Sequence, residues 1–482
     1  MLVLYIQSLA LHVVIVLVVA TELASSQQDE CRIDFASGQT CRFDGLSNGV
    51  STLIYPDPSS GARCFTDTRR DGTPQEYFFQ VIPGDVSNLL LWFQGGSACF
   101  STETCIDGGL TVQDIFPLNL TLFSNGVLDT TDPRNPFAGW TLVYLPYCSG
   151  DSFMGNKVTE DGLVHFKGNK NARAVLDWLF ANFGDGADNV DNRPLERAIF
   201  GGLSSGALAL AYWSNLLLQW INSGFTQQVQ KPITTVLFDS NVFFFKEYLS
   251  DRVLEIWDVC QPNIGFNQTI LELCKQGDFF GLEAVLLVTK TYTDVPFAFI
   301  LGKGDLVLLG GWCVSGLEGI DVAAGSIDLA NFGLADVFTV LLYLAQSDPA
   351  QVADALYCTP SRFYKKVQER LLILHENVNE ENNVLSYFIN TPDHAFLPFE
   401  AFYTTSASDG CTFPTVSSDS PPSLVDWVSS LVYRVEGARL SSECVKGVGL
   451  WPWDDFGCNK EVTHQFHIAK GDDSVTIPPN PP

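Results

Sequence analysis

Residues 198–217, AIFGGLSSGALALAYWSNLL, join a short apolar strand pattern to an apolar helix pattern through a turn of small residues. The turn, Gly202-Leu203-Ser204-Ser205-Gly206, matches G-x-S-x-G. Such a turn is so sharp that its flanking residues must be small, and it holds the serine hydroxyl out at the edge of the sheet. The stretch therefore predicts a strand that runs directly into a helix, with Ser204 either a nucleophile or simply a small residue at a tight turn.

Strand and helix patterns alternate along much of the chain. Apolar runs that close on polar or turn residues predict five more strands, in NLLLWFQGG, WTLVYLPYCSGD, TTVLFDSN, VPFAFILGKGD and VLSYFINTPDH. Between them, NARAVLDWLFANF has its apolar residues at helical spacing. This alternation predicts an α/β fold with a mostly parallel central sheet that helices cover on both faces. In open sheets of this kind, chemistry gathers at the carboxyl ends of the strands.

The N-terminal segment predicts secretion. LVLYIQSLALHVVIVLVVA is apolar and directly precedes TELASSQQ, where Ala24 and Ser26 fit the small-residue rule for signal cleavage. We therefore expect residues 1–26 to be a signal peptide. Because no Lys or Arg precedes the apolar run, an uncleaved membrane anchor is the alternative. Residues 27–460 are expected to form a single domain, followed by a polar C-terminal tail over residues 461–482.

The cysteines and two glycosylation sequons agree with secretion. The chain has 13 cysteines, all beyond the apolar N-terminal segment and none in a C-x-x-C pair. In an oxidising compartment most would form disulfides, and the odd number leaves at least one free or paired with another chain. Asn119-Leu120-Thr121 and Asn267-Gln268-Thr269 match the N-glycosylation sequon.

The net charge of −28 restricts the partners of the protein. A protein that binds nucleic acid or an anionic membrane needs clustered Lys and Arg, so we expect neither as a partner after signal cleavage. No metal site or other cofactor is indicated, because His and Cys are not clustered at ligand spacing. The sequence does not determine the oligomeric state.

A nucleophilic serine needs a base, which is nearly always histidine. The chain has six His, and four are poorly placed, in the signal, a helical pattern or the region near the polar tail: His12, His375, His464 and His467. His165 precedes a helical pattern, whereas His394 ends a strand pattern beyond Ser204. The order serine, acid, histidine that accompanies this turn selects His394. A lone His at such a place can equally be a hydrogen-bonded turn residue.

The acid is expected at a strand end between the serine and the histidine. Asp305 follows the apolar run of VPFAFILGKGD and a turn that contains glycine. Asp239 also ends a strand pattern and is the stronger rival, while Asp393 is a weaker one because adjacent side chains usually point apart. The acid would hold the imidazole of His394 in the right tautomer and stabilise the imidazolium.

Donors for a developing oxyanion are expected after an early strand. Gly95 and Gly96 end the strand pattern of LWFQGG and would expose backbone amides, and the amide of Ser205 would be a further donor. Cys99 and Cys105 are near enough in sequence for a short disulfide that would stiffen this loop. The alternative is an ordinary glycine turn.

These residues together resemble the pectin acetylesterase family, which includes the Notum-type lipid carboxylesterases. The resemblance is carried by FQGGSACFSTETC, YLPYCSGDSFMG, VHFKGNKNARAVLDWLFANF, IFGGLSSGALALAY, FAFILGKGDLVLL and YFINTPDHAFL followed by LVDWV, in order from about Leu89 to Val428. It implies an α/β-hydrolase-like three-layer sandwich and a catalytic triad of Ser204, Asp305 and His394.

The same resemblance implies a secreted serine esterase. Its substrate would be an acetylated cell-wall or extracellular polysaccharide, which it would deacetylate, or a small ester, which it would hydrolyse. The chain departs from the family pattern at three places: it has Ser205 where the family usually has Ala, no Cys near His394, and Gln94 where an acidic residue is common. The acidic surface opposes pectin in particular, since it repels polygalacturonate. The alternatives are a Notum-like lipid esterase, a non-catalytic glycan-binding member of the fold and, more remotely, a serine peptidase.

Overall fold

The computed structural model describes residues 28–69, 71–99, 114–118, 125–184, 194–228, 230–241, 253–279, 281–305, 307–309, 360–377, 383–389, 391, 393–405, 423–434 and 442–443. The expected signal peptide and C-terminal tail, together with Cys105 and Asn119, lie outside these ranges. None of the helices within them is long and apolar enough to cross a membrane.

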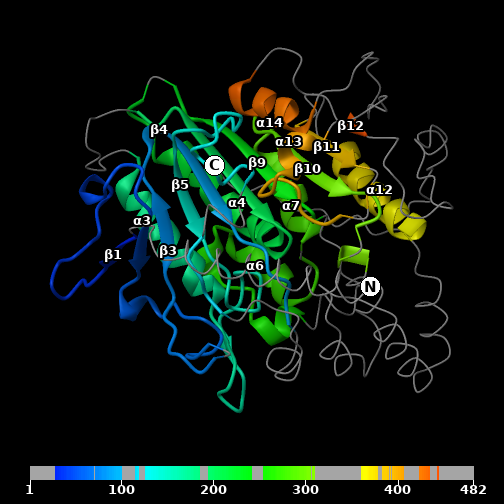
Figure 1. Ribbon diagram of the computed structural model, residues 1–482. Helices are drawn as coiled ribbons and strands as arrows, with labels where there is room; N and C mark the ends of the chain where they lie inside the picture. The colour runs from blue at the N-terminus through cyan, green and yellow to red at the C-terminus, as the bar shows by residue number, and fades with distance from the viewer. Residues whose placement is uncertain are drawn as a thin grey trace, which may run out of the picture.

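A ten-stranded sheet runs through the described part of the chain (Figure 1). Its spatial order is β1-β2-β3-β5-β4-β8-β9-β10-β11-β12. The strands are β1 (Asp29–Arg32), β2 (Thr52–Tyr55), β3 (Phe79–Ile82), β4 (Asp85–Phe93), β5 (Trp140–Leu145), β8 (Arg197–Leu203), β9 (Ile233–Asp239), β10 (Phe297–Gly302), β11 (Val384–Ile389) and β12 (Ser442–Glu443). All neighbouring pairs are parallel except those that β3 makes with β2 and β5. A mostly parallel sheet is thus confirmed, and each of the six predicted strands is present.

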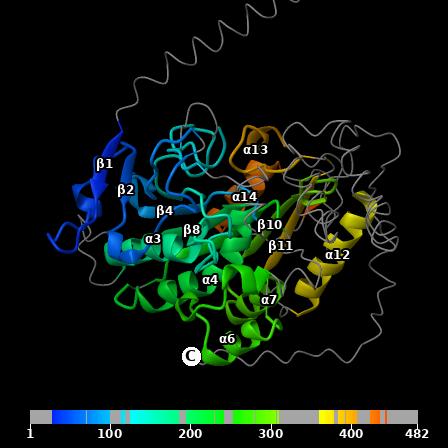
Figure 2. The same ribbon diagram turned by 90° about the horizontal axis from the view of Figure 1, so that it is seen from below.

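Helices cover both faces of this sheet, as Figure 2 shows. One layer contains α3 (Gly168–Asn182), α4 (Ser205–Ser223), α6 (Gln268–Lys275), α7 (Leu282–Thr291) and α12 (Pro360–Asn377). The other contains α13 (Ala401–Thr404) and α14 (Leu424–Tyr433). Smaller elements in the described ranges are the hairpin of β6 (Lys157–Val158) and β7 (His165–Phe166) and the 3₁₀ turns η1 (Phe43–Gly45), η2 (Pro58–Ser60) and η3 (Pro262–Ile264).

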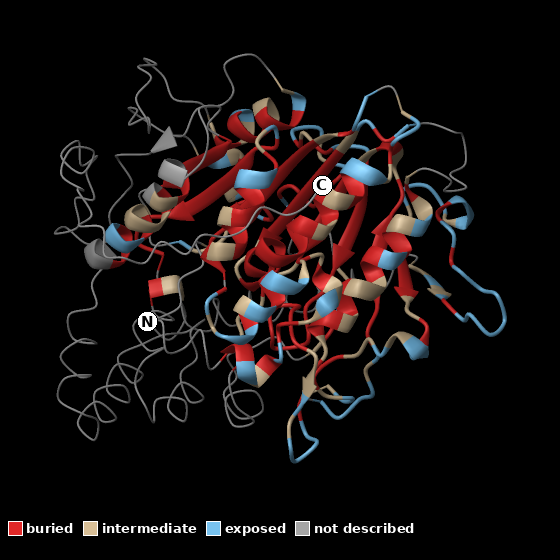
Figure 3. Cartoon of the chain, turned by 180° about the vertical axis from the view of Figure 1, so that it is seen from behind, coloured by how far each residue is buried: buried red, intermediate tan, exposed pale blue. Residues whose placement is uncertain are grey.

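The strands of the sheet centre are apolar on both sides because each side faces a helical layer. In β4, Leu89, Leu91 and Phe93 belong to the core under α3 and α4, whereas Leu90 and Trp92 belong to the core under α14. Such strands read as continuous apolar runs rather than as an alternation. Figure 3 shows this band of buried residues through the sheet and the helices that cover it.

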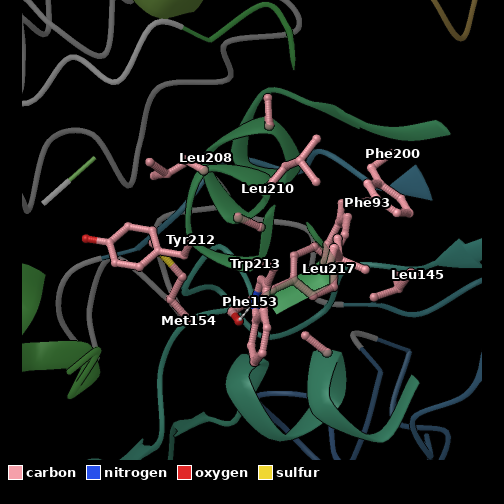
Figure 4. Close-up of a cluster of buried hydrophobic side chains, with 14 of the residues drawn as sticks. Phe93, Leu145, Phe153, Met154, Phe200, Leu208, Leu210, Tyr212, Trp213 and Leu217 are labelled. Atoms are coloured by element: carbon pink, nitrogen blue, oxygen red, sulfur yellow. Dashed lines mark hydrogen bonds between the residues drawn. The ribbon is translucent and has the colours of Figure 1, made fainter. Parts of the chain in front are cut away.

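The helix α4 is the centre of the larger core (Figure 4). A helix that is apolar around most of its circumference must be buried on all sides, and Leu208, Trp213 and Leu217 are almost inaccessible to solvent. The indole nitrogen of Trp213 donates to the carbonyl of Phe153 at 3.0 Å, so its only polar atom is satisfied. The burial of α4 fixes the position of its first residue, which follows Ser204 directly.

Disulfides tie the irregular segments to the sheet. Three pairs join cysteines that both lie in the described ranges, Cys31–Cys41, Cys64–Cys148 and Cys260–Cys274. The second closes a separation of 84 residues and joins the segment before β3 to the loop after β5. Cys99 is also in a disulfide, so every cysteine in the described ranges is oxidised. Disulfides of this kind persist in oxidising compartments.

Candidate active site

Four neighbouring parallel strands, β8, β9, β10 and β11, end at the same edge of the sheet. Ser204 directly follows β8, Asp239 is the last residue of β9, Asp305 follows β10, and His394 follows β11. Leu203 is paired with Asp239 in the sheet register, and Gly302 with Ile389. Residues far apart in the sequence are therefore brought to one edge because parallel strands share it.

Ser204 lies in the strained turn that its sequence motif predicts. Its backbone has φ of 53° and ψ of −118°, a conformation that non-glycine residues adopt rarely. The turn is held from both sides: the Ser204 amide donates to the carbonyl of Asp239 at 2.8 Å, and the Ser204 carbonyl accepts from Nδ2 of Asn241 at 2.9 Å.

Close backbone approach explains the two glycines of the motif. A Cβ on Gly202 would lie 2.5 Å from the carbonyl oxygen of Gly206, and one on Gly206 would overlap the carbonyl oxygen of Phe93. Strand β8, the start of α4 and the end of β4 thus touch through backbone atoms. Side chains at either position would force these elements apart.

The glycine loop after β4 packs directly on this turn. A Cβ on Gly95 would lie 2.7 Å from the carbonyl oxygen of Leu203 and 3.1 Å from Cβ of Ser204. Gly96 is the residue directly after this contact. Ser205 begins α4, so its amide has no intrahelical acceptor. Its hydroxyl is buried and makes no hydrogen bond within the described part of the chain. The Cys99 partner suggested by the sequence, Cys105, lies outside that part.

Asp305 and His394 are in direct contact, with 2.8 Å between Oδ2 and Nδ1. The Asp305 side chain is fully buried, and its other oxygen accepts the amides of Val307 at 3.0 Å and Leu308 at 2.9 Å. The His394 side chain is 15% exposed. With Nδ1 facing a carboxylate, the neutral ring carries its proton there and leaves Nε2 as an acceptor.

The electrostatic surroundings favour the protonated form of His394. Burial lowers the pKa of His394, but the charge of Asp305, its hydrogen bond and the charge of Asp239 outweigh burial and raise that pKa above 6.5. A raised pKa makes the neutral ring a stronger acceptor for a proton.

Ser204 and His394 both lie at this sheet edge, but within the described part of the chain no hydrogen bond joins the serine hydroxyl to the histidine ring. Hydrogen bonds of this kind are often long in unliganded enzymes and tighten when substrate binds. What connects the two segments is Asp239, whose backbone carbonyl binds the Ser204 amide and whose carboxylate binds the loop after His394.

Asp239 was a rival to Asp305 as the acid that binds the His394 ring, but its carboxylate binds other groups. Its Oδ2 accepts the amides of Phe396 at 2.9 Å and Leu397 at 2.7 Å, and its Oδ1 accepts the Ser240 hydroxyl at 2.9 Å. The other rival, Asp393, is exposed and accepts from the Thr391 hydroxyl. The ring of His394 is bound by Asp305 and by neither of these.

Two contributors were missed in the sequence, Ser240 and Asn241. The signal that could have found them is the run of three polar residues, Asp-Ser-Asn, that directly follows an apolar strand at the edge where Ser204 lies.

Other predicted positions lie away from this edge. Asn267 is the N-cap of α6, where its side-chain oxygen accepts from the Ile270 amide at 3.0 Å, and Thr269 of the same sequon is exposed. His165 lies in the β6–β7 hairpin. Across the described ranges, no group of three His, Cys, Asp or Glu side chains could hold a metal ion.

Comparison with known proteins gives a consistent set of relatives. The family model described as Pectinacetylesterase matches residues 47–250. Pectin acetylesterase 11 of Arabidopsis thaliana is 32% identical over 163 residues, which are 33% of this chain and 38% of that protein. The palmitoleoyl-protein carboxylesterase NOTUM of Schmidtea mediterranea is 28% identical over 129 residues, or 26% of this chain and 24% of that protein. The alignments thus span less than two fifths of these relatives.

Among solved structures, the Wnt deacylase Notum from Drosophila matches with a TM-score of 0.50. The match covers 79% of this chain and 93% of that one at 12% sequence identity. At this identity the likeness concerns the fold. It places the sheet and its helical layers in the α/β-hydrolase-like class.

Proposed function

We propose that the chain is a member of the pectin acetylesterase and Notum family and that it is a carboxylic-ester hydrolase with Ser204 as nucleophile. One observation carries the proposal. A buried carboxylate, Asp305, binds Nδ1 of His394 at 2.8 Å, at the sheet edge where Ser204 lies in a strained turn. This is the arrangement by which a carboxylate fixes the tautomer of a catalytic base.

The reaction follows from the positions of these groups. Nε2 of His394 takes the Ser204 proton while Oγ attacks the ester carbonyl carbon. The tetrahedral oxyanion is stabilised by the amides of Gly96 and Ser205, and a single such donor contributes about 3 kcal/mol in other hydrolases. His394 then protonates the departing alcohol oxygen. Water, deprotonated by the same ring, hydrolyses the acyl-enzyme and releases the acid.

The α4 N-terminus supports the same step. The helix begins at Ser205 and has 19 residues, so its first amides have no intrahelical acceptor and its N-terminus favours negative charge beside Ser204. The strain at Ser204 and the close contacts of Gly202 and Gly206 keep these amides fixed before substrate binds. A site that is already arranged for the oxyanion loses little free energy to reorganisation.

We propose an acetyl ester on an extracellular polysaccharide as the substrate class. The relatives named pectin acetylesterases support this class. A net charge of −28 opposes binding of a polyanion such as polygalacturonate, which favours a neutral acetylated glycan. The relatives and the structure named Notum support a second candidate, a longer acyl ester. Secretion of the protein, with residues 1–26 as signal peptide, is supported by the disulfides.

The proposal is tested by labelling the purified protein with a fluorophosphonate and mapping the adduct by mass spectrometry. We expect one adduct on Ser204, absent in Ser204→Ala and strongly slowed in His394→Gln. Ser223→Ala is the matched control, because Ser223 is an exposed serine at the other end of α4. A folded protein that takes no label would contradict the hydrolase and favour a glycan-binding member of the fold. Acetate release from acetylated glycans, against hydrolysis of long-chain esters, then separates the two substrate classes.

A further inference from the structure

Asp239, Ser240 and Asn241 lie between the two halves of the candidate active site. Asp239 is the last residue of β9, and β9 lies between β8, which leads to Ser204, and β10, which leads to Asp305. The amide of Ser240 donates to the carbonyl of Ile300 in β10 at 2.8 Å, so this tripeptide is also fixed to the strand beyond. We call residues 239–241 the β9 clamp.

On one side, the β9 clamp holds the nucleophile turn by its backbone. The Asp239 carbonyl accepts the Ser204 amide at 2.8 Å, and the Asn241 side chain donates to the Ser204 carbonyl at 2.9 Å. Both peptide groups of Ser204 are therefore bound to the same tripeptide. A residue at φ of 53° needs such support, since that backbone conformation is unfavourable on its own.

On the other side, the β9 clamp holds the histidine loop by side chains. Oγ of Ser240 accepts the Ala395 amide at 2.8 Å, and Oδ2 of Asp239 accepts the amides of Phe396 and Leu397 at 2.9 and 2.7 Å. The three amides that follow His394 are thus all bound. Ala395 has φ of 79°, so the loop bends sharply directly after the histidine.

The carboxylate of Asp239 is fully buried among these donors. Burial raises its pKa to about 6, although the bonds from Phe396, Leu397 and Ser240 and the charge of His394 work in the other direction. A buried carboxylate with three hydrogen-bond donors forms charge-assisted bonds, which are stronger than those to a neutral acceptor. The charged groups that act on His394 are Asp305, through its charge and hydrogen bond, and Asp239, through its charge.

We propose that Asp239 is a positioning residue for ester hydrolysis, because it fixes the nucleophile turn and the histidine loop to one another and adds a second negative charge beside the His394 ring. The inference rests on the proposed function and extends it. Asp305 orients the ring directly, whereas Asp239 acts through the backbone and through its field. The distance between Ser204 and the ring is then set by the β9 clamp rather than by a direct bond between them.

Three substitutions separate the two effects. Asp239→Ala removes the acceptor and the charge. Asp239→Asn keeps one oxygen for the amides of Phe396 and Leu397, and its new amino group can donate to Ser240, so it removes mainly the charge. Asp393→Asn is the matched control, since Asp393 is an exposed carboxylate one residue before His394 that binds Thr391.

The full chain and its variants are compared by kcat, KM and fluorophosphonate labelling rate with 4-nitrophenyl acetate as substrate. The His394 ring is also titrated by NMR and assigned with His394→Gln. We expect Asp239→Ala to lower kcat and the labelling rate by about 10- to 100-fold with little change in KM, the size of effect that a small misplacement produces. Asp239→Asn should lower the pKa of His394. Asp393→Asn should change neither kcat nor the pKa of His394.

The NMR titration does not depend on catalysis, so the two proposals fail separately. A wild-type protein that neither hydrolyses nor labels overturns the proposed function, while the His394 titration and amide exchange at Phe396 and Leu397 still test the clamp. An unchanged His394 pKa in Asp239→Asn, together with unchanged exchange at the Phe396 and Leu397 amides in Asp239→Ala, overturns the clamp even if the enzyme is active. If Asp239→Ala does not fold, Asp239→Asn alone decides through the titration.

Discussion

Replacing Asp305 with asparagine changes one atom of a buried side chain and reverses a hydrogen bond. In the wild type, Oδ1 accepts the amides of Val307 and Leu308, and Oδ2 faces Nδ1 of His394. An asparagine must keep its oxygen toward those two amides, since an amino group cannot accept from them. Its Nδ2 then faces His394 and donates to Nδ1.

The consequence for His394 is the wrong tautomer. When Nδ1 accepts, the neutral ring carries its proton on Nε2 and cannot take the proton of Ser204. In a serine protease the same exchange lowers kcat by about 10⁴-fold with the geometry intact. That factor corresponds to about 5.5 kcal/mol of activation free energy. We expect an effect of this order here, with at most about 3 kcal/mol lost from the free energy of unfolding through the weakened bond.

The assay is steady-state hydrolysis of 4-nitrophenyl acetate together with the rate of fluorophosphonate labelling, at several pH values. Wild-type activity should rise as pH increases through the His394 pKa, which lies above 6.5, because only the neutral ring is a base. Urea melts exclude loss of folded protein, and Asp393→Asn serves as the exposed control. A fall in kcat of less than tenfold in folded Asp305→Asn would show that His394 does not depend on this tautomer, and the proposed mechanism would be wrong.

Two further predictions concern stability. Gly206→Ala should lower the free energy of unfolding by about 3 kcal/mol or more, because its Cβ would overlap the Phe93 carbonyl. The control Gly45→Ala has open space around its Cβ and should change that free energy by no more than about 0.5 kcal/mol. Equal melting temperatures of the two variants would contradict this prediction. Burial raises the pKa of Asp151 to about 7, so the native state holds a proton that the unfolded state, at 3.8, releases. The resulting stability is complete below about pH 4 and is lost as pH rises through 7, with a slope of about 1.4 kcal/mol per pH unit in between. Asp151→Asn should remove this slope from urea melts at pH 5, 6 and 7, and a slope equal to that of the wild type would refute the assignment.

Much of the fold could be predicted because its signals are local. The apolar runs, the helical spacing of residues 171–183 and the small residues around Ser204 each report on a few consecutive residues. All six predicted strands are present, and the sheet is mostly parallel. The antiparallel pairs of β3 were not predicted, because strand direction depends on contacts between segments that the local pattern does not encode.

The order of residues along the chain and the endings of the strands were enough to select Ser204, Asp305 and His394 as candidates. They did not decide between the carboxylates, since Asp239 and Asp305 both follow apolar strands. The tertiary structure shows which of the two contacts the His394 ring. Asp239 is still paired in the sheet, and its carboxylate meets the backbone of the histidine loop, whereas Asp305 lies three residues beyond β10, where it binds the His394 ring.

What the sequence by itself determined was therefore the set of elements and the residue types at their ends, because hydrophobic periodicity and turn sterics act over short distances. What only the tertiary structure decided was which side chains meet. The bond between Asp305 and His394 spans 89 residues, and the β9 clamp joins segments from positions 204, 239 and 395. Such contacts arise from the register and stagger of neighbouring strands, which are set by packing of the whole sheet against its two helical layers.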